Sequence, residues 1–169
     1  MSHLRDQLAA LSATSPESIV EMLSGLEDRA TAIIAASLLE NFLGLAIAYK
    51  FGRFPSESEF GRLFTGYGPL ATLSARIMFA YNLKIINADS RHDFIIIKDI
   101  RNQFAHTYLP LTFETGKISA NCYNLKLTIK LIPPLSETVH DNARGKYIKS
   151  IMGNMSIIIS SAPFKTSAS

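Results

Sequence analysis

A long apolar segment from Ala30 to Tyr49 constrains the fold of this 169-residue chain more than any other feature. Its length approaches that of a membrane span. Glu40 and Asn41 stand at its centre, however, and a carboxylate at that depth disfavours insertion by roughly 2.5 to 3.5 kcal/mol. The segment is therefore predicted to be the buried central helix of a bundle, with a membrane span as the minor alternative.

Helix-start signals divide the rest of the N-terminal half. Ser15-Pro16-Glu17 combines a capping hydroxyl, a proline suited to the first turn and an acid near the positive end of the helix dipole. Residues 55–59 repeat this pattern. Gly66-Tyr67-Gly68-Pro69 is typical of a plain turn and completes neither a P-loop nor a dinucleotide fingerprint. These signals predict helices over residues 16–23, 28–51, 56–64 and 70–83, with Asp28 capping the long helix.

The C-terminal half is less uniform. Three consecutive isoleucines at 95–97 fit both helix and strand, but the cap Asp89-Ser90 and the lack of a turn signal before Pro110 favour helix. Residues 111–136 leave a short hairpin and a helix open. An apolar stripe predicts a final helix over residues 142–159. We expect one all-α domain over residues 1–162 and a flexible tail over 163–169.

Composition excludes several classes of protein. Seventeen Lys and Arg against fourteen Asp and Glu give a net charge of +3, too little for a dedicated duplex-DNA binder. Cys122 is the single cysteine, and the first residues lack the pattern of a secretory signal, so a cytoplasmic location is expected. His3, His92 and His140 are isolated, and no cluster has metal-ligand spacing, so neither a metal nor another cofactor is expected.

The segment Arg101-Asn102-Gln103-Phe104-Ala105-His106-Thr107-Tyr108 carries the candidate chemistry. On a helix, Asp99, Asn102 and His106 share one face, and Arg101 reaches toward it. Asp99 then either orients the guanidinium or fixes the tautomer of His106. The plainer interpretation is a histidine at a helix C-terminus beside an ordinary surface ion pair, and spacing alone favours it.

This segment resembles the HEPN motif, in which an arginine and a following polar residue precede a histidine by four to six positions. Tyr108 also matches the extended form found in HEPN toxins. A wider stretch resembles the MltR family, named for the mannitol operon repressor, over roughly residues 28 to 160. The agreement lies in Gly68-Pro69-Leu70, Leu73, Ala75-Arg76, Tyr81-Asn82-Leu83, Ile86, Asp93, residues 100–106, Phe113-Glu114, Ile118, Cys122 and Leu125. Tyr67 departs from the acidic Gly-Asp-Gly-Pro turn of the family, which weakens any role for that loop.

The resemblance implies a HEPN-like helical bundle that forms a two-fold homodimer and acts as a metal-independent endoribonuclease or toxin. His106 would take the proton from a ribose 2′-hydroxyl, Arg101 would hold the phosphate, and Asn102 would position the RNA backbone, with Asp99 and Tyr108 in support. Paired HEPN systems also imply a nucleotidyltransferase antitoxin, which attaches nucleotides to the tyrosine corresponding to Tyr108.

The alternative from the same resemblance is a non-catalytic MltR-like regulator that works through another protein. Arg101 and His106 would then be structural. No basic recognition helix follows a short glycine turn, so direct groove reading of DNA is not expected. Arg144, Lys146 and Lys149 form the best local basic patch and are the candidate RNA-binding residues, although a solvated helix face is the favoured explanation of their pattern.

Overall fold

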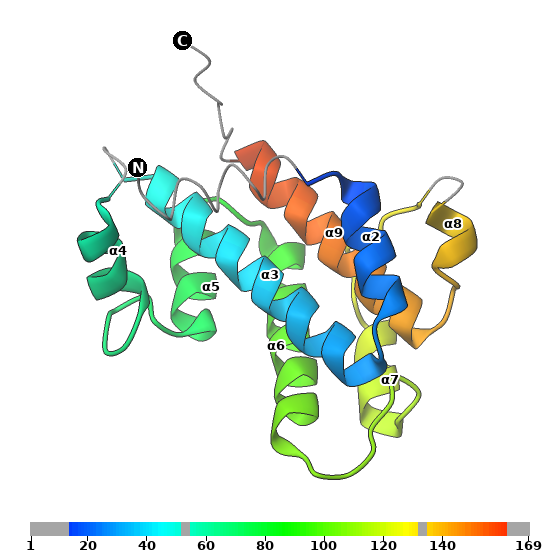
Figure 1. The fold of residues 1–169 in the computed structure, drawn as a ribbon. Coiled ribbons are helices and arrows are strands. Elements are labelled where there is room, and N and C mark those ends of the chain that lie inside the picture. The colour runs from blue at the N-terminus through cyan, green and yellow to red at the C-terminus, as the bar shows by residue number, and fades with distance from the viewer. Residues whose placement is uncertain (1–13, 52–54, 132–134, 162–169) are drawn as a thin grey trace.

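The computed structural model describes residues 14–51, 55–131 and 135–161. Within them the structure contains helices and no strand, which confirms the all-α prediction (Figure 1). The helices are α2 (Pro16–Gly25), α3 (Asp28–Tyr49), α4 (Glu57–Phe64), α5 (Leu73–Asn82), α6 (Ala88–His106), α7 (Gly116–Tyr123), α8 (Leu135–Thr138) and α9 (Ala143–Ser161).

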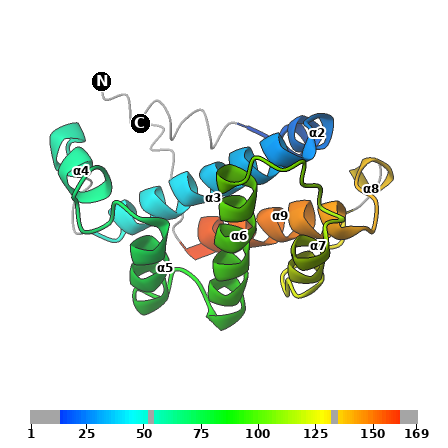
Figure 2. The same ribbon diagram turned by 90° about the horizontal axis from the view of Figure 1, so that it is seen from below.

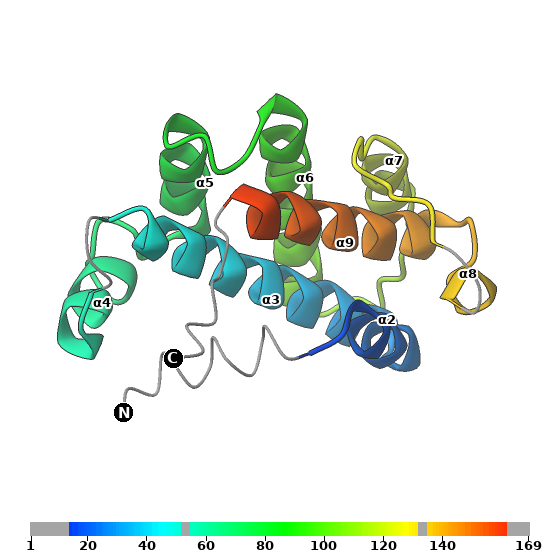
Figure 3. The same ribbon diagram turned by 90° about the horizontal axis from the view of Figure 1, so that it is seen from above.

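Two layers of helices make up the fold. The two long helices α3 and α9 lie side by side (Figure 1). Helices α5, α6 and α7 lie together on one side of that pair, as the views from below and above both show (Figures 2 and 3). Because α3 packs against α5, α6 and α9, it forms the centre of the core.

The predicted buried central helix is confirmed in α3. Most of its residues from Thr31 to Ala48 are buried, and they pack into the main hydrophobic cluster. Within the described residues it is the one helix long and apolar enough to cross a membrane, and the greater part of it is covered by other helices. Its predicted cap was wrong, because Glu27 occupies the N-cap position and the Asp28 carboxylate binds the backbone N–H of Phe113 at 2.9 Å instead.

Local capping explains where the shorter helices begin. Ser15 caps α2, and Ser56 forms a reciprocal capping box with Glu59 at the start of α4. The helix predicted from residue 70 begins at Leu73, because Thr72 provides its cap. The cap of α6 is Asn87 rather than the predicted Asp89-Ser90, since its side chain accepts a hydrogen bond from Ser90 N at 2.8 Å.

The described residues of the open region 111–136 contain α7, an irregular segment over 124–131 and the start of α8, so the hairpin alternative is wrong for this part. Asp93, which is buried on α6, holds this segment in place. Its carboxylate accepts hydrogen bonds from the backbone N–H groups of Lys126 and Leu127 and from the Ser150 hydroxyl, each at 2.9 Å. Close packing also requires Gly153, because a Cβ there would lie 2.2 Å from the carbonyl oxygen of Leu127.

The final helix was predicted over residues 142–159 and is confirmed in α9 over Ala143–Ser161. Its Tyr147 is fully buried, and the phenol donates a hydrogen bond to the Ala32 carbonyl of α3 at 2.9 Å. Phe113 lies between the rings of Phe104 and Tyr147, with centroids 5.2 and 5.1 Å away. The predicted domain boundary and tail at residues 162 and 163 lie outside the described residues.

Candidate functional site

The last two turns of α6 hold the predicted motif. The Arg101 guanidinium donates one hydrogen bond to Asn102 Oδ1 at 3.1 Å and a second to Glu40 Oε2 at 3.3 Å. The Arg101 side chain is 30% exposed and that of Glu40 is 17% exposed. The structure therefore brings Arg101 and Asn102 together and adds Glu40, a residue of α3 that was not predicted to belong to this site.

Glu40 also faces a second arginine. Arg76 of α5 lies with Nη1 3.7 Å from the Glu40 carboxylate, and it donates hydrogen bonds to the carbonyls of Leu70 and Phe64 at 2.8 Å each. Burial lowers the pKa of Arg76, and the charge of Glu40 opposes this effect. Arg76, Glu40 and Arg101 form what we call the Glu40 cluster, which joins three helices through one carboxylate.

A signal for the Glu40 cluster exists in the sequence. A lone carboxylate in the middle of a buried helix is costly unless it is paired with a cation. Glu40 therefore requires a basic partner from another helix. Sequence spacing does not identify Arg76 and Arg101 as those partners, because they lie 36 and 61 residues further along the chain.

His106 and Asp99 are not joined to this cluster by any hydrogen bond or ion pair between described residues. His106 is the last residue of α6 and is exposed to solvent. The Asp99 carboxylate is about half exposed and lies 3.9 Å from Lys98 Nζ. Neither expected contact of Asp99, with Arg101 or with His106, is formed among the described residues, and Arg101 pairs with Glu40 instead.

The loop after α6 exposes Tyr108 but fixes the backbone around it. Arg29 of α3 donates hydrogen bonds to the carbonyls of Thr107 at 3.0 Å and Leu109 at 3.1 Å. Leu109 N also donates to the Thr107 hydroxyl at 3.2 Å. Tyr108 has a relative exposure of 104% and Leu109 of 68%. Tyr108 and Leu109 are therefore two exposed side chains on a loop whose backbone is held by hydrogen bonds on both sides of Tyr108.

The predicted basic patch is divided by the structure. The Arg144 guanidinium forms an ion pair with Asp28 at 2.8 Å, binds the Thr31 hydroxyl at 3.0 Å, and donates to the carbonyls of Leu23, Ser24 and Leu26. Arg144 thus fastens α9 to the α2–α3 connection, and its N–H groups face protein acceptors rather than solvent.

Lys146 and Lys149 share one carboxylate, that of Asp141, at 3.4 and 3.2 Å. Their hydrogen bonds hold the pKa of Asp141 below its ordinary value, with a further contribution from the two positive charges. The three candidate RNA-binding residues therefore do not present one common surface of free cations. No group of three His, Cys, Asp or Glu side chains able to hold a metal occurs among the residues that the structure describes.

The arrangement defines an all-α fold built on a central apolar helix. The same fold occurs in a crystal structure of the MtlR–HPr complex from Escherichia coli, with a TM-score of 0.65 and 21% sequence identity over 85% of this chain and 97% of that chain. The resemblance to the mannitol operon repressor is thus confirmed for the fold, which is MtlR-like. No protein-family model matches the sequence, and no curated protein matches it.

Proposed function

We propose that this chain is a non-catalytic regulatory module that acts by binding a protein partner, as MtlR binds HPr in its complex. The observation that carries the proposal is the match of the fold over nearly the full length of both chains. Transcription regulation through such a partner, in the cytoplasm, is the corresponding cellular role. Direct reading of DNA is not part of the proposal, since no basic recognition helix was found in the sequence.

The Glu40 cluster supports a structural role for Arg101. An arginine that clamps a phosphate uses two parallel N–H groups for it. In Arg101 one terminal nitrogen is bonded to Asn102 and the other to Glu40. A phosphate would compete for this guanidinium with a partly buried carboxylate that also balances Arg76, which disfavours binding.

The loop at Tyr108 supplies a suitable contact point for a partner. Exposed tyrosine side chains on a rigid backbone are favourable binding anchors, because little conformational entropy is lost when they are covered. Tyr108 and Leu109 meet this description, and the Arg29 hydrogen bonds supply the rigidity.

The test is isothermal titration of the purified protein with HPr, both from Escherichia coli and from the genome that encodes this chain. We expect saturable binding that weakens at least roughly tenfold in Tyr108→Ser, as for a central aromatic contact. Tyr123→Ser is the matched control, because Tyr123 is exposed at the end of α7 and not on the loop that carries Tyr108. Failure of the folded protein to bind either HPr would reject this partner and with it the proposal.

A second candidate function is a metal-independent endoribonuclease that works as a homodimer. One observation favours it: Arg101, Asn102 and His106 lie on the last turns of one helix, and His106 is open to solvent. Neutral His106 would accept the 2′-hydroxyl proton, and Arg101 would stabilise the phosphate after leaving Glu40. Two such motifs would meet across the dimer axis.

Cleavage of a labelled RNA in EDTA tests this second function. The nuclease predicts that wild type cleaves and His106→Ala does not, whereas the regulator predicts no cleavage by either. The antitoxin hypothesis is tested separately. A mass increase on Tyr108 after co-expression with a neighbouring nucleotidyltransferase would support it, and an unshifted mass would reject it.

A further inference from the structure

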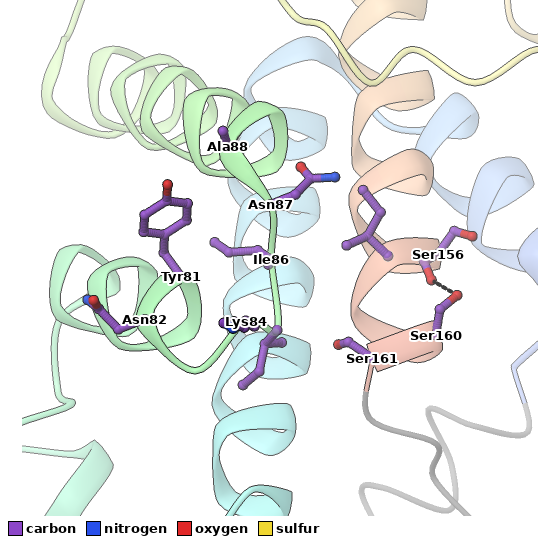
Figure 4. Close-up of a pocket in the computed structure, with 11 residues that line it drawn as sticks. Tyr81, Asn82, Lys84, Ile86, Asn87, Ala88, Ser156, Ser160 and Ser161 are labelled. Carbon is purple, nitrogen blue, oxygen red and sulfur yellow. Dashed lines mark hydrogen bonds between the residues drawn. The ribbon is translucent and has the colours of Figure 1, made fainter.

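A groove lies at the opposite end of α6 from the motif, beside its first turn. It has a volume of about 770 Å³, within the range of small-molecule sites. One wall is the turn between α5 and α6, and the other is the last turns of α9 (Figure 4). Ile85 and Ile86 are buried beneath it. Its polar lining consists of Tyr81, Asn82, Lys84, Asn87, Ser156, Ser160 and Ser161.

Lys84 has an unusual backbone conformation for its residue type. Its φ is 56°, which makes it the one non-glycine residue with positive φ within the described part of the chain. It follows the C-cap of α5, where Ile85 N bonds the Ala80 carbonyl at 2.9 Å. Glycine is the usual residue at such a position, because a side chain there costs conformational energy. The side chain of Lys84 is exposed and lines the groove.

The described lining of the groove carries one positive charge and no negative charge. Among the described residues, Lys84 is the only charged residue of the lining, and it forms no ion pair with any of them. The nearby Asp89 carboxylate is bound to Lys126 Nζ at 2.9 Å. The hydroxyls of Ser160 and Ser161 donate to the carbonyls of Ser156 and Ile158, so they partly satisfy the negative end of α9.

We propose that this groove binds a small anionic metabolite whose phosphate or carboxylate group pairs with the Lys84 ammonium. The same ligand would carry hydroxyl groups, which match the amide of Asn87 and the hydroxyl of Ser156 at the rim. The buried isoleucines would contact its carbon skeleton. This site is separate from both functions proposed above, and it gives the fold a means of sensing a metabolite.

Titration calorimetry with three probes tests the proposal: glycerol 3-phosphate, glycerate and glycerol. The two charged probes distinguish a phosphate from a carboxylate ligand, and glycerol supplies hydroxyls without charge. We expect at least one charged probe to bind and glycerol not to bind. Amide chemical-shift changes at Asn87 and Ser156 would place the bound probe in the groove. Lack of binding by both charged probes, or equal binding of glycerol, would overturn the proposal.

Substitution of Lys84 separates a binding role from a structural one. Lys84→Gly removes the ammonium and relieves the left-handed strain, so we expect a higher melting temperature together with binding weakened by roughly tenfold or more. Lys84→Arg keeps the charge and should retain binding. Lys130→Gln, which removes an exposed lysine elsewhere, is the control. A Lys84→Gly variant that melts lower, or binds as well as wild type, would show that the lysine only supports the turn.

Discussion

Glu40 of α3 and Arg101 of α6 meet at 3.3 Å, although 61 residues separate them in the chain. The same carboxylate faces Arg76, so it balances two guanidinium groups. We expect Glu40→Gln to lower the free energy of unfolding by about 2 kcal/mol, because Arg76 then keeps a buried charge without its partner. Arg101→Gln should cost about 1 kcal/mol, since that side chain is more exposed.

Urea denaturation of both variants and of the double variant measures this coupling. The double variant is expected to be less destabilised than the sum of the two single variants, because the charges compensate one another. Strict additivity would mean that the contact contributes no stability.

A second prediction concerns Arg144, whose planar guanidinium binds several acceptors of the α2–α3 connection at once. Arg144→Lys is expected to lower stability by about 2 kcal/mol, because an ammonium does not reach Asp28 and the carbonyls of the α2–α3 connection together. Lys126→Ala, which breaks an exposed pair with Asp89, should change stability by no more than about 0.5 kcal/mol. Thermal melting of the two variants compares them. Equal melting temperatures would contradict the structural role of Arg144.

The two glycines Gly153 and Gly61 give opposite expectations for substitution by alanine. At Gly153 the added Cβ would collide with the Leu127 carbonyl, so Gly153→Ala should lose about 3 kcal/mol. At Gly61, inside α4, an added methyl group would meet no neighbouring residue within 4 Å, and the helix gains about 0.5 to 1 kcal/mol. Denaturant midpoints test both. A tolerated Gly153→Ala would show that the 124–131 segment does not lie against α9.

Alkaline pH should destabilise the protein through two buried groups. Burial raises the pKa of the Cys122 thiol from 9.0 to about 12, and it raises the pKa of the Tyr147 phenol as well. The unfolded chain releases these protons first. Stability from the neutral thiol is therefore complete below pH 9 and is lost as pH rises toward 12, by about 2 kcal/mol at pH 10.5.

Unfolding by urea at about pH 7.5 and about pH 10.5 measures this loss. Cys122→Ala should reduce the difference between the two pH values, because it removes the larger of the two contributions. In the native protein near pH 8, Cys122 should also resist alkylation. An identical pH dependence in Cys122→Ala would exclude the thiol as the cause.

Local interactions explain what could be predicted from the sequence. Caps such as Ser15 and Ser56 act within three residues, so the starts of α2 and α4 follow from a short pattern. The apolar length of α3 likewise predicts its burial. Asp28 shows the limit of such local patterns. Its carboxylate binds Phe113 and Arg144, which lie 85 and 116 positions further along the chain, and Glu27 occupies the cap position.

The candidate site was predictable only in part, for the same reason. The spacing of Arg101, Asn102 and His106 placed them on one helix, but the acidic partner was assigned to Asp99 rather than Glu40. A contact between helices depends on how the helices cross, and a single sequence does not contain that angle. The roles of Arg29 and Arg144 were missed because most of their acceptors are backbone carbonyls, which have no sequence signature.

The burial of α3 under α9 also has a consequence during synthesis, because α3 leaves the ribosome before the helix that covers it. Helix α3 emerges roughly 100 residues before α9, which at ordinary elongation rates is a delay of about 5 to 20 s. During that interval the nascent chain displays an apolar helix of membrane-spanning length with one of its covering helices still unsynthesised. We therefore expect the nascent chain to be bound by a chaperone, or by competing membrane-targeting factors, before the folded protein meets any partner.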